Sequence, residues 1–193
     1  EPVEDETKQE SAYTGTEVNV MSYNVFYQDA EYRSESIFNI IKDADPDVLF
    51  LQEVSEMWLP LLHDFMEENG YAYYAYGRYG SEMSGTQEHG DQYAPVLWKA
   101  DKYDVVEEGH FWLSSTPDEV RSSSWEDGTV SEFPRCNNWV KLKDKETEKE
   151  NSIYLIDKKL EDYTDNEKKV YEIKAEIDGK TEKLLTGYLD ETI

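Results

Sequence analysis

The sequence predicts an α/β fold, and three observations lead to that prediction. A strand-like run near the start is followed by an amphipathic helix-like segment that ends at Asp45-Pro46-Asp47. The next residues, Val48 to Leu51, form a continuous apolar run, which is typical of a strand covered on both faces. Several short strand-like runs separated by turn residues then follow. A chain of 193 residues with 38% hydrophobic residues is large enough for one domain with a real core.

The first strand is expected over residues 17–26 and the second over residues 48–54. Between them, apolar residues at helical spacing form one stripe: Ile37, Phe38, Ile40 and Ile41. The helix should stop before Pro46, because the residue before a proline leaves the α region. Each strand ends in a polar residue, Asn24 in the first and Glu53 in the second. An α/β unit places such strand ends on one rim of a sheet, so we expect this amide and this carboxylate to meet there.

A second helix is expected after Ser55, which would cap it, and Gly70 would end it. Its apolar face would consist of Trp58, Leu59, Leu61, Leu62, Phe65 and Met66. The remaining prediction is a list of segments: strands at 71–76, 94–98, 103–106, 110–113, 137–142, 152–157 and 184–189, polar loops at 77–91 and 114–134, a charged hairpin turn at 143–151, and helical character at 164–176.

Composition restricts the function. The formal net charge is −25 at pH 7, and a surface this acidic repels polyphosphate backbones, so long DNA or RNA is an unfavourable substrate. A small phosphorylated molecule would be repelled less and is therefore the more favourable substrate. The single cysteine, Cys136, excludes an internal disulfide and a zinc site of several cysteines, and we interpret it as a small packed residue. The sequence contains no G-x-S-x-G, H-E-x-x-H or C-x-x-C motif.

Residues 1–16 are polar, acidic and without periodicity, which predicts a flexible lead-in before a domain at 17–193. Such a lead-in suits an exported protein after signal removal, so we expect a secreted or surface-tethered protein, while a cytoplasmic origin stays open. No run approaches the ~18 apolar residues that a membrane span needs.

Four sequence blocks resemble the endonuclease/exonuclease/phosphatase superfamily, which includes DNase I-like nucleases. They are MSYNV with Asn24, DADPDVLFLQEV with Glu53, HFWLSSTPDE, and RCNNWVKL starting at Arg135. The resemblance implies a four-layer α/β sandwich of DNase I type and metal-dependent hydrolysis of a phosphoester. By this resemblance Glu53 would bind Mg²⁺ (or Mn²⁺), and Asn24 would help to hold the metal or the phosphate. Arginine suits two-point contact with phosphate, so Arg135 is the candidate phosphate ligand, with a surface ion pair as the alternative.

The later blocks of that family do not match. The family positions for a histidine and an aspartate fall on Lys159 and Glu161, and those for a further aspartate and asparagine fall on Tyr188 and Asp190. The family's concluding block, whose histidine is the general base, has no counterpart up to Ile193. A sandwich incomplete at this end would expose a sheet edge, so a homodimer or a partner chain is an expected way to cover it.

Two functions therefore stay open. The first is a Mg²⁺-dependent phosphodiesterase or phosphatase that acts on a small phosphorylated molecule or on a sugar or lipid phosphodiester. The second is a pseudo-enzyme that binds a ligand or carbohydrate without hydrolysing it, because lysine and tyrosine cannot replace the family's acid–base groups near pH 7. In that case the two polar loops would bind the ligand, with Tyr79, Trp125 and Phe133 available for stacking.

Overall fold

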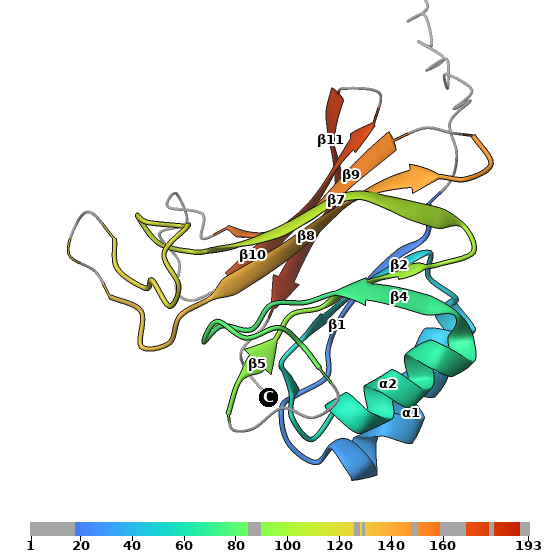
Figure 1. Cartoon of the computed structure of the whole chain (residues 1–193), viewed down its shortest axis with the longest axis horizontal. Helices are drawn as coiled ribbons and strands as arrows, with labels where there is room; N and C mark the ends of the chain where they lie inside the picture. Colours follow the sequence, from blue (N-terminus) through green and yellow to red (C-terminus); the bar gives the residue numbers. More distant parts are fainter. Residues whose placement is uncertain are drawn as a thin grey trace, which may run out of the picture.

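The computed structural model describes residues 18–84, 90–125, 128, 130–147, 150–158, 169–177 and 180–189, and side chains are described as far as residue 147. In that part of the chain two β-sheets face each other, and two helices cover the outer face of the first sheet (Figure 1). The order of elements is β1 Val20–Asn24, α1 Ala30–Ala44, β2 Val48–Gln52, β3 Val54–Ser55, α2 Leu59–Asn69, β4 Tyr71–Tyr74, β5 Gln92–Tyr93, β6 Val96–Lys99, β7 Tyr103–Trp112, β8 Cys136–Asp144, β9 Glu150–Lys158, β10 Lys169–Ile177 and β11 Lys180–Leu189.

The first sheet has the strand order β1-β2-β6-β4. Strands β1 and β2 run parallel, with Val20 opposite Val48 and Asn24 opposite Gln52, as the predicted strand–helix–strand unit requires. Residues 48–51 of β2 are each 2% exposed or less, which confirms a central strand covered on both faces. The described residues thus confirm the predicted α/β class.

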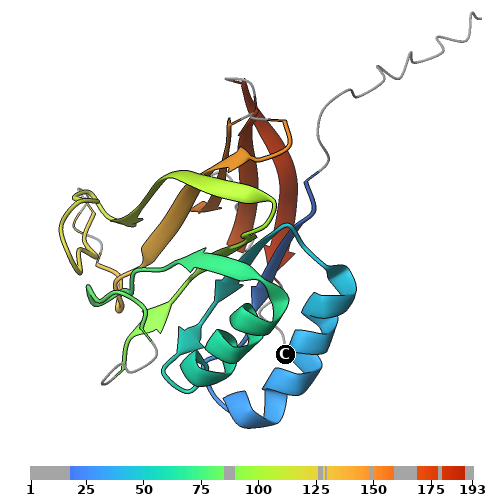
Figure 2. The same ribbon diagram turned by 45° about the vertical axis from the view of Figure 1, so that its right-hand side comes forward.

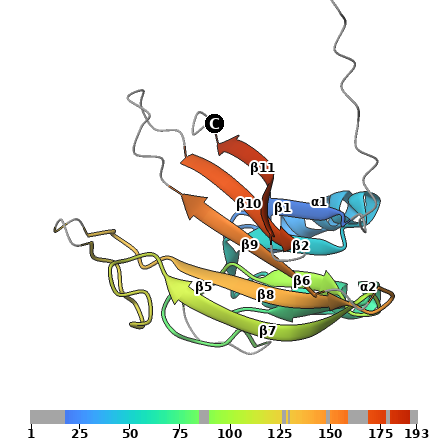
Figure 3. The ribbon, with the colours of Figure 1, turned by 90° about the horizontal axis from the view of Figure 1, so that it is seen from above.

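Two hydrophobic cores hold the layers together. The two helices lie against one face of the first sheet (Figure 2), and the larger core lies between the helices and that sheet. This core includes Trp58, Leu62 and Phe65 of the predicted apolar helix face. The smaller core lies between the two sheets, where Phe50 and Trp98 of the first sheet pack with Val140 and other residues of the second. The second sheet has the order β11-β10-β9-β8-β7, with each strand antiparallel to its neighbour (Figure 3). One helical layer and two sheets of the expected four-layer sandwich are therefore described.

Three local predictions were wrong. Residues 169–177 form β10 instead of a helix, because Tyr171 to Ile177 alternate apolar and charged residues with a period of two. Residues 103–112 form one continuous strand, β7, where two strands were expected; a register shift between Val105 and Glu107 marks the irregularity. Ser55 is not the cap of α2, since the Ser55 hydroxyl donates a 2.6 Å hydrogen bond to the Tyr27 carbonyl.

Neither helix of the described chain has both the length and the hydropathy that crossing a bilayer requires.

The strand ends and loops at one end of the sandwich form a continuous edge, which we call the rim. It contains the C-terminal ends of β1, β2, β4 and β7, the N-terminal ends of β6 and β8, and the loops at 77–84, 90–95 and 113–135. The register places these parts together, because Phe50 and Tyr74 both pair with Val96, and the Leu51 amide donates to the Pro95 carbonyl at 3.1 Å. Several of these loops extend toward the left in Figure 1.

Candidate functional site

The rim brings the predicted amide and carboxylate to neighbouring positions. Asn24 is the last residue of β1 and lies opposite Gln52, and Glu53 follows Gln52 directly. The exposed Asn24 side chain accepts a hydrogen bond at Oδ1 from the Phe26 amide, 2.9 Å away. Glu53 is half-buried, and no described residue makes a hydrogen bond or ion pair with its carboxylate. Both side chains are therefore available at the same strand ends.

Backbone strain is concentrated where β1 and β2 end. Three residues that are not glycine have left-handed backbone angles there, with φ of 63° at Phe26, 56° at Asp29 and 60° at Glu53. Each such residue costs about 1–3 kcal/mol and persists only where its surroundings hold it, most often at functional sites. The Phe26 carbonyl is held here by the Trp58 indole N–H at 2.7 Å. The strain favours a functional interpretation of this corner of the rim.

Magnesium is compatible with these two residues. Mg²⁺ prefers oxygen ligands, keeps several water molecules and needs only one or two carboxylates from the protein. The Asn24 carbonyl oxygen retains one lone pair beyond its bond to the Phe26 amide, and the Glu53 carboxylate supplies the negative charge. In the described part of the chain, no group of three or more His, Cys, Asp or Glu side chains could hold a metal ion. Any site here would thus have one amide and one carboxylate as its described ligands.

Arg135 lies on the same rim but on the second sheet, immediately before β8. Its carbonyl accepts a 2.9 Å hydrogen bond from the Leu113 amide, and its exposed guanidinium has no partner among the described residues. The buried amide of Asn138 joins this sheet to the first, because it accepts from the Tyr76 amide at 2.8 Å and donates to the Ala94 carbonyl at 3.1 Å. This bridge places the start of β8 at the rim.

Of the four positions that depart from the family pattern, the structure describes only the backbone of one. Lys159, Glu161 and Asp190 lie outside the described residues. The backbone of Tyr188 belongs to β11 and pairs with Val170 of β10.

The two polar loops meet around Arg78, a residue that the sequence analysis did not select. The Arg78 guanidinium lies 5.0 Å from the ring centre of Tyr79 and 5.1 Å from that of Phe133, the two aromatic residues predicted from different loops. Arg121 also lies over Tyr79, at 5.7 Å. The third predicted stacking residue, Trp125, is 44% exposed. A signal was present in the sequence, because Arg78 and Arg121 both lie in loops predicted at the rim.

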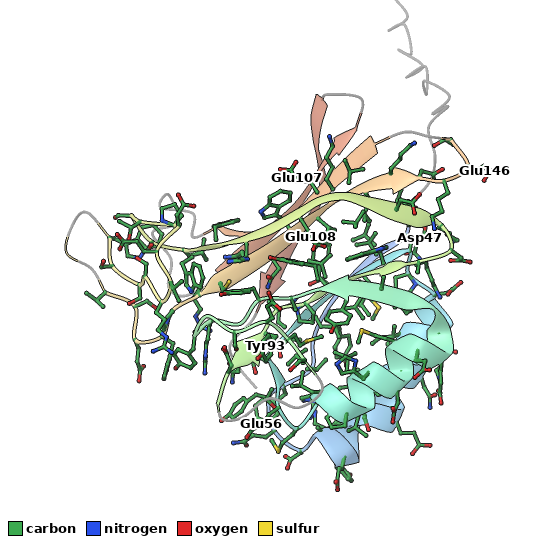
Figure 4. All side chains as sticks on the ribbon, viewed as in Figure 1. Asp47, Glu56, Tyr93, Glu107, Glu108 and Glu146 are labelled. Carbon is green, nitrogen blue, oxygen red and sulfur yellow. The ribbon has the colours of Figure 1, made fainter. Side chains whose placement is uncertain are left out.

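Asp91 holds the first of these loops in shape. Its carboxylate accepts hydrogen bonds from the amides of Tyr79 and Gln92 and from the Ser81 hydroxyl. The Ser81 hydroxyl also bonds to the Tyr93 hydroxyl at 3.0 Å, and Tyr93 is labelled in Figure 4. Gly77 is required beside Asp91, because a Cβ atom at Gly77 would lie 2.2 Å from Asp91 Oδ2. The backbone around Arg78 is therefore fixed by a nearly buried carboxylate.

An aromatic group lines the rim end of the space between the sheets. His110 Nδ1 and the Tyr74 hydroxyl share a hydrogen bond of 2.7 Å, and the His110 ring stacks on Tyr76 at 3.8 Å. Burial lowers the pKa of His110, while burial and the nearby Glu108 raise the pKa of Tyr74 to about 12. Glu108 lies on the inner side of β7 in Figure 4. The sequence analysis assigned no role to His110, and in the structure its ring packs against Tyr76 and hydrogen-bonds to Tyr74.

Comparison with known proteins gives a consistent result. Residues 21–141 match the model of the Endonuclease/Exonuclease/phosphatase family. An endonuclease/exonuclease/phosphatase of Bacteroides vulgatus is 28% identical with a TM-score of 0.59, over 70% of this chain and 50% of that chain. The mannosyl-6-phosphatase Bt3783 of Bacteroides thetaiotaomicron is 26% identical with a TM-score of 0.52, over 69% and 49%. The chain thus spans about half the length of these structures. A search of curated proteins found no match.

Proposed function

This chain belongs to the endonuclease/exonuclease/phosphatase family, and on that premise we propose that its rim hydrolyses the phosphoester of a small molecule with the help of a divalent metal ion. One observation carries the proposal. Within the matched segment, Asn24 and Glu53 occupy neighbouring strand ends, and Glu53 has a strained backbone that packing interactions must maintain.

The residues have distinct roles in this proposal. The Asn24 carbonyl oxygen and the Glu53 carboxylate would be the protein ligands of Mg²⁺ or Mn²⁺. When bound, the metal ion would polarise a phosphoryl oxygen and neutralise its charge. Arg135 would hold the phosphate of the substrate through two parallel N–H donors, since its guanidinium is exposed on the same rim. The Glu53 carboxylate has no hydrogen-bond or ion-pair partner among the described residues, which supports this assignment, because a half-buried charge favours a cation beside it.

The net charge of the chain favours a small substrate over a long polyanion. A chain with a net charge of −25 repels a long polyanion, but a single phosphate group faces much less repulsion once a metal ion and Arg135 lie beside it. One similar structure is named a mannosyl-6-phosphatase, which supports a sugar phosphate as the first class to test.

Metal binding and hydrolysis should be measured separately. Mn²⁺ binding at the rim should broaden the backbone NMR signals of residues near Asn24, and Glu53→Ala should abolish this local broadening. Hydrolysis of a sugar phosphate and of a generic phosphodiester should require Mg²⁺ or Mn²⁺ and should fall at least ~10²-fold in Glu53→Ala. Glu67→Ala is the matched control, because Glu67 is exposed on α2 near the opposite end of the molecule. Activity that is equal in wild type and Glu53→Ala would refute the proposal.

Binding without hydrolysis is the second candidate. Binding without hydrolysis is favoured by the residue types at two positions: Lys159 and Tyr188 occupy positions where the family pattern has a histidine and an aspartate. Losing general acid–base groups costs about 10²–10⁴-fold each, so the rim would bind ligand with little turnover. Calorimetry that detects a sugar phosphate, together with turnover no faster than in Glu53→Ala, would favour this candidate over the first.

A further inference from the structure

We propose that Arg78 and Arg121 form a second anion site on the rim, which holds a negatively charged oxygen group of the substrate other than the phosphoester. The proposal rests on the proposed function, because it extends the same ligand from Asn24 and Glu53 toward the polar loops. It selects a class of substrate: small molecules with two anionic groups.

Arginine and lysine side chains are distributed unevenly over the molecule. Three of the four arginines of the sequence, Arg78, Arg121 and Arg135, lie in the rim, and the fourth, Arg33, lies near the start of α1. The six lysines with described side chains lie at or toward the opposite end: Lys42, Lys99, Lys102, Lys141, Lys143 and Lys145. Within the two polar loops of the rim, Arg78 and Arg121 are the cationic side chains that an anion can meet.

The arginines and the lysines differ in whether a carboxylate pairs with them. At the opposite end, Lys99 pairs with Asp45 at 2.9 Å, and Lys102 pairs with Asp47, which is labelled in Figure 4. No arginine makes an ion pair with any described residue. The Nε atom of Arg78 is buried and has no hydrogen-bond partner there either. An unpaired buried donor is costly, and Arg78 Nε bears this cost while the guanidinium charge rests against two aromatic rings.

Both Arg78 and Arg121 are held in place before any ligand binds. The Arg78 carbonyl accepts a 3.0 Å hydrogen bond from the indole N–H of the buried Trp112. The Arg121 Nε donates to the Tyr79 carbonyl at 2.8 Å, and Arg121 itself has a left-handed φ of 67°. The guanidinium of Arg78 rests over two aromatic rings, which orients its plane. Preorganised donors lose less entropy when an anion binds.

The two loops also contact each other tightly. A Cβ atom built at Gly80 would lie 2.5 Å from Val120 Cγ1, so the loop of Arg78 and the loop of Arg121 touch at this glycine. Gly80 has a φ of 93°, a conformation that glycine adopts without strain. The position of Arg121 beside Tyr79 depends on this close approach.

Strand pairing gives the separation between the two sites. The Arg78 amide donates to the Gln92 carbonyl, and Gln92 pairs with Ser55, two residues after Glu53. Two strand spacings of about 4.8 Å place the Arg78 backbone roughly 10 Å from that of Ser55. Glu53 lies two residues before Ser55, about 7 Å along the chain, so its backbone lies up to about 17 Å from that of Arg78. The Arg78 side chain, the Glu53 side chain and the proposed metal ion would occupy part of that span, and a sugar with anionic groups at both ends would bridge the rest. Guanidinium groups bind carboxylate and phosphate with the same two-point geometry, so either group fits.

Calorimetry with three hexose probes tests the site: a 6-phosphate, a 1,6-bisphosphate, and a 1-phosphate whose C6 is a carboxylate. The full chain should bind at least one doubly charged probe about tenfold tighter than the 6-phosphate. The comparison between the two doubly charged probes identifies the group that the site takes. Arg78→Gln and Arg121→Gln should each reduce the preference below about threefold and leave 6-phosphate affinity unchanged. Lys42→Gln removes one charge from the opposite end of α1 and should keep the preference.

The outcomes separate the two proposals. A preference that persists in Glu53→Ala and disappears in Arg78→Gln supports the second anion site even if no hydrolysis is found. Hydrolysis that depends on Glu53, with equal affinity for singly and doubly charged probes, refutes the second site alone. Failure of all three probes to bind also refutes it. If Arg78→Gln loses the native circular dichroism spectrum, the affinity of Arg121→Gln for the singly and doubly charged probes tests the second anion site instead.

Discussion

Substituting Gly77 by alanine should destabilise the rim severely. The added Cβ would lie 2.2, 2.4 and 2.7 Å from three atoms of the Asp91 carboxyl group, so the carboxylate must move. Asp91 is only 8% exposed and accepts hydrogen bonds from two amides and a hydroxyl. Hydrogen bonds to a charged group contribute about 1.5–3 kcal/mol each, so losing two of them should lower the free energy of unfolding by about 3–6 kcal/mol.

Thermal and urea unfolding followed by circular dichroism measure this effect. A loss of that size corresponds to a fall in Tm of about 10 °C in a domain of this length. Gly90→Ala is the matched control: Gly90 has a φ of 79° and nothing within 4 Å, so alanine there should cost only the backbone strain of ~1 kcal/mol.

A double substitution tests the reasoning itself. In an Asp91→Ala background the clash partner is absent, so Gly77→Ala should cost less than about 1 kcal/mol. If Gly77→Ala lowered the free energy of unfolding as much in the Asp91→Ala variant as in the wild type, the proposed role of the Asp91 carboxylate would be refuted. A Gly77→Ala variant as stable as the wild type would refute it too.

Three further predictions concern titratable groups. Because burial lowers the pKa of His110 in the folded state, the unfolded chain takes up a proton first, and the free energy of unfolding should fall as pH drops below about 6.5. His110→Gln should flatten that slope in urea titrations; an unchanged slope would exclude His110 as its source. Hydrogen bonds from Thr147 and Glu146 lower the pKa of Asp144, so its stabilisation should be present above about pH 4 and lost as pH falls through the lowered pKa. Asp144→Asn should therefore be less stable than wild type at pH 7 and converge with it in acid; a constant difference would contradict this. Burial, assisted by the charge of Asp91, raises the pKa of Cys136 to about 12, so iodoacetamide at pH 8 should label Cys136 only after unfolding, as mass spectrometry would report. Rapid labelling of the native protein would contradict this.

The parts of the site that sequence reasoning found are those that follow from local pattern. The apolar run of β2 and the helix before it predicted a parallel strand pair, and that pairing places Asn24 opposite Gln52, the residue before Glu53. Gly70 ends α2 as expected, in a left-handed conformation. The helical prediction was wrong at residues 169–176, because an alternation with a period of two in β10 was interpreted as helical character.

The arginine site could not be predicted in the same way. Arg78 meets Phe133, and Arg121 meets Tyr79, through contacts between loops with no periodic pattern in sequence. These contacts depend on a single close approach at Gly80 and on a carboxylate that holds the loop from inside. A sequence gives the residue types in such loops but not which of them face each other.

By itself, the sequence determined the α/β class, the buried central strand and the two strand ends that carry an amide and a carboxylate. Those features follow from hydrophobic periodicity and from the geometry of parallel strands, both of which are local or nearly local. Only the tertiary structure decided that two loops from different sheets meet around Arg78 and that three of the four arginines gather at the rim without ion-pair partners among the described residues. Long-range packing controls those features, because loop conformations are set by the few specific contacts that fold the chain back on itself.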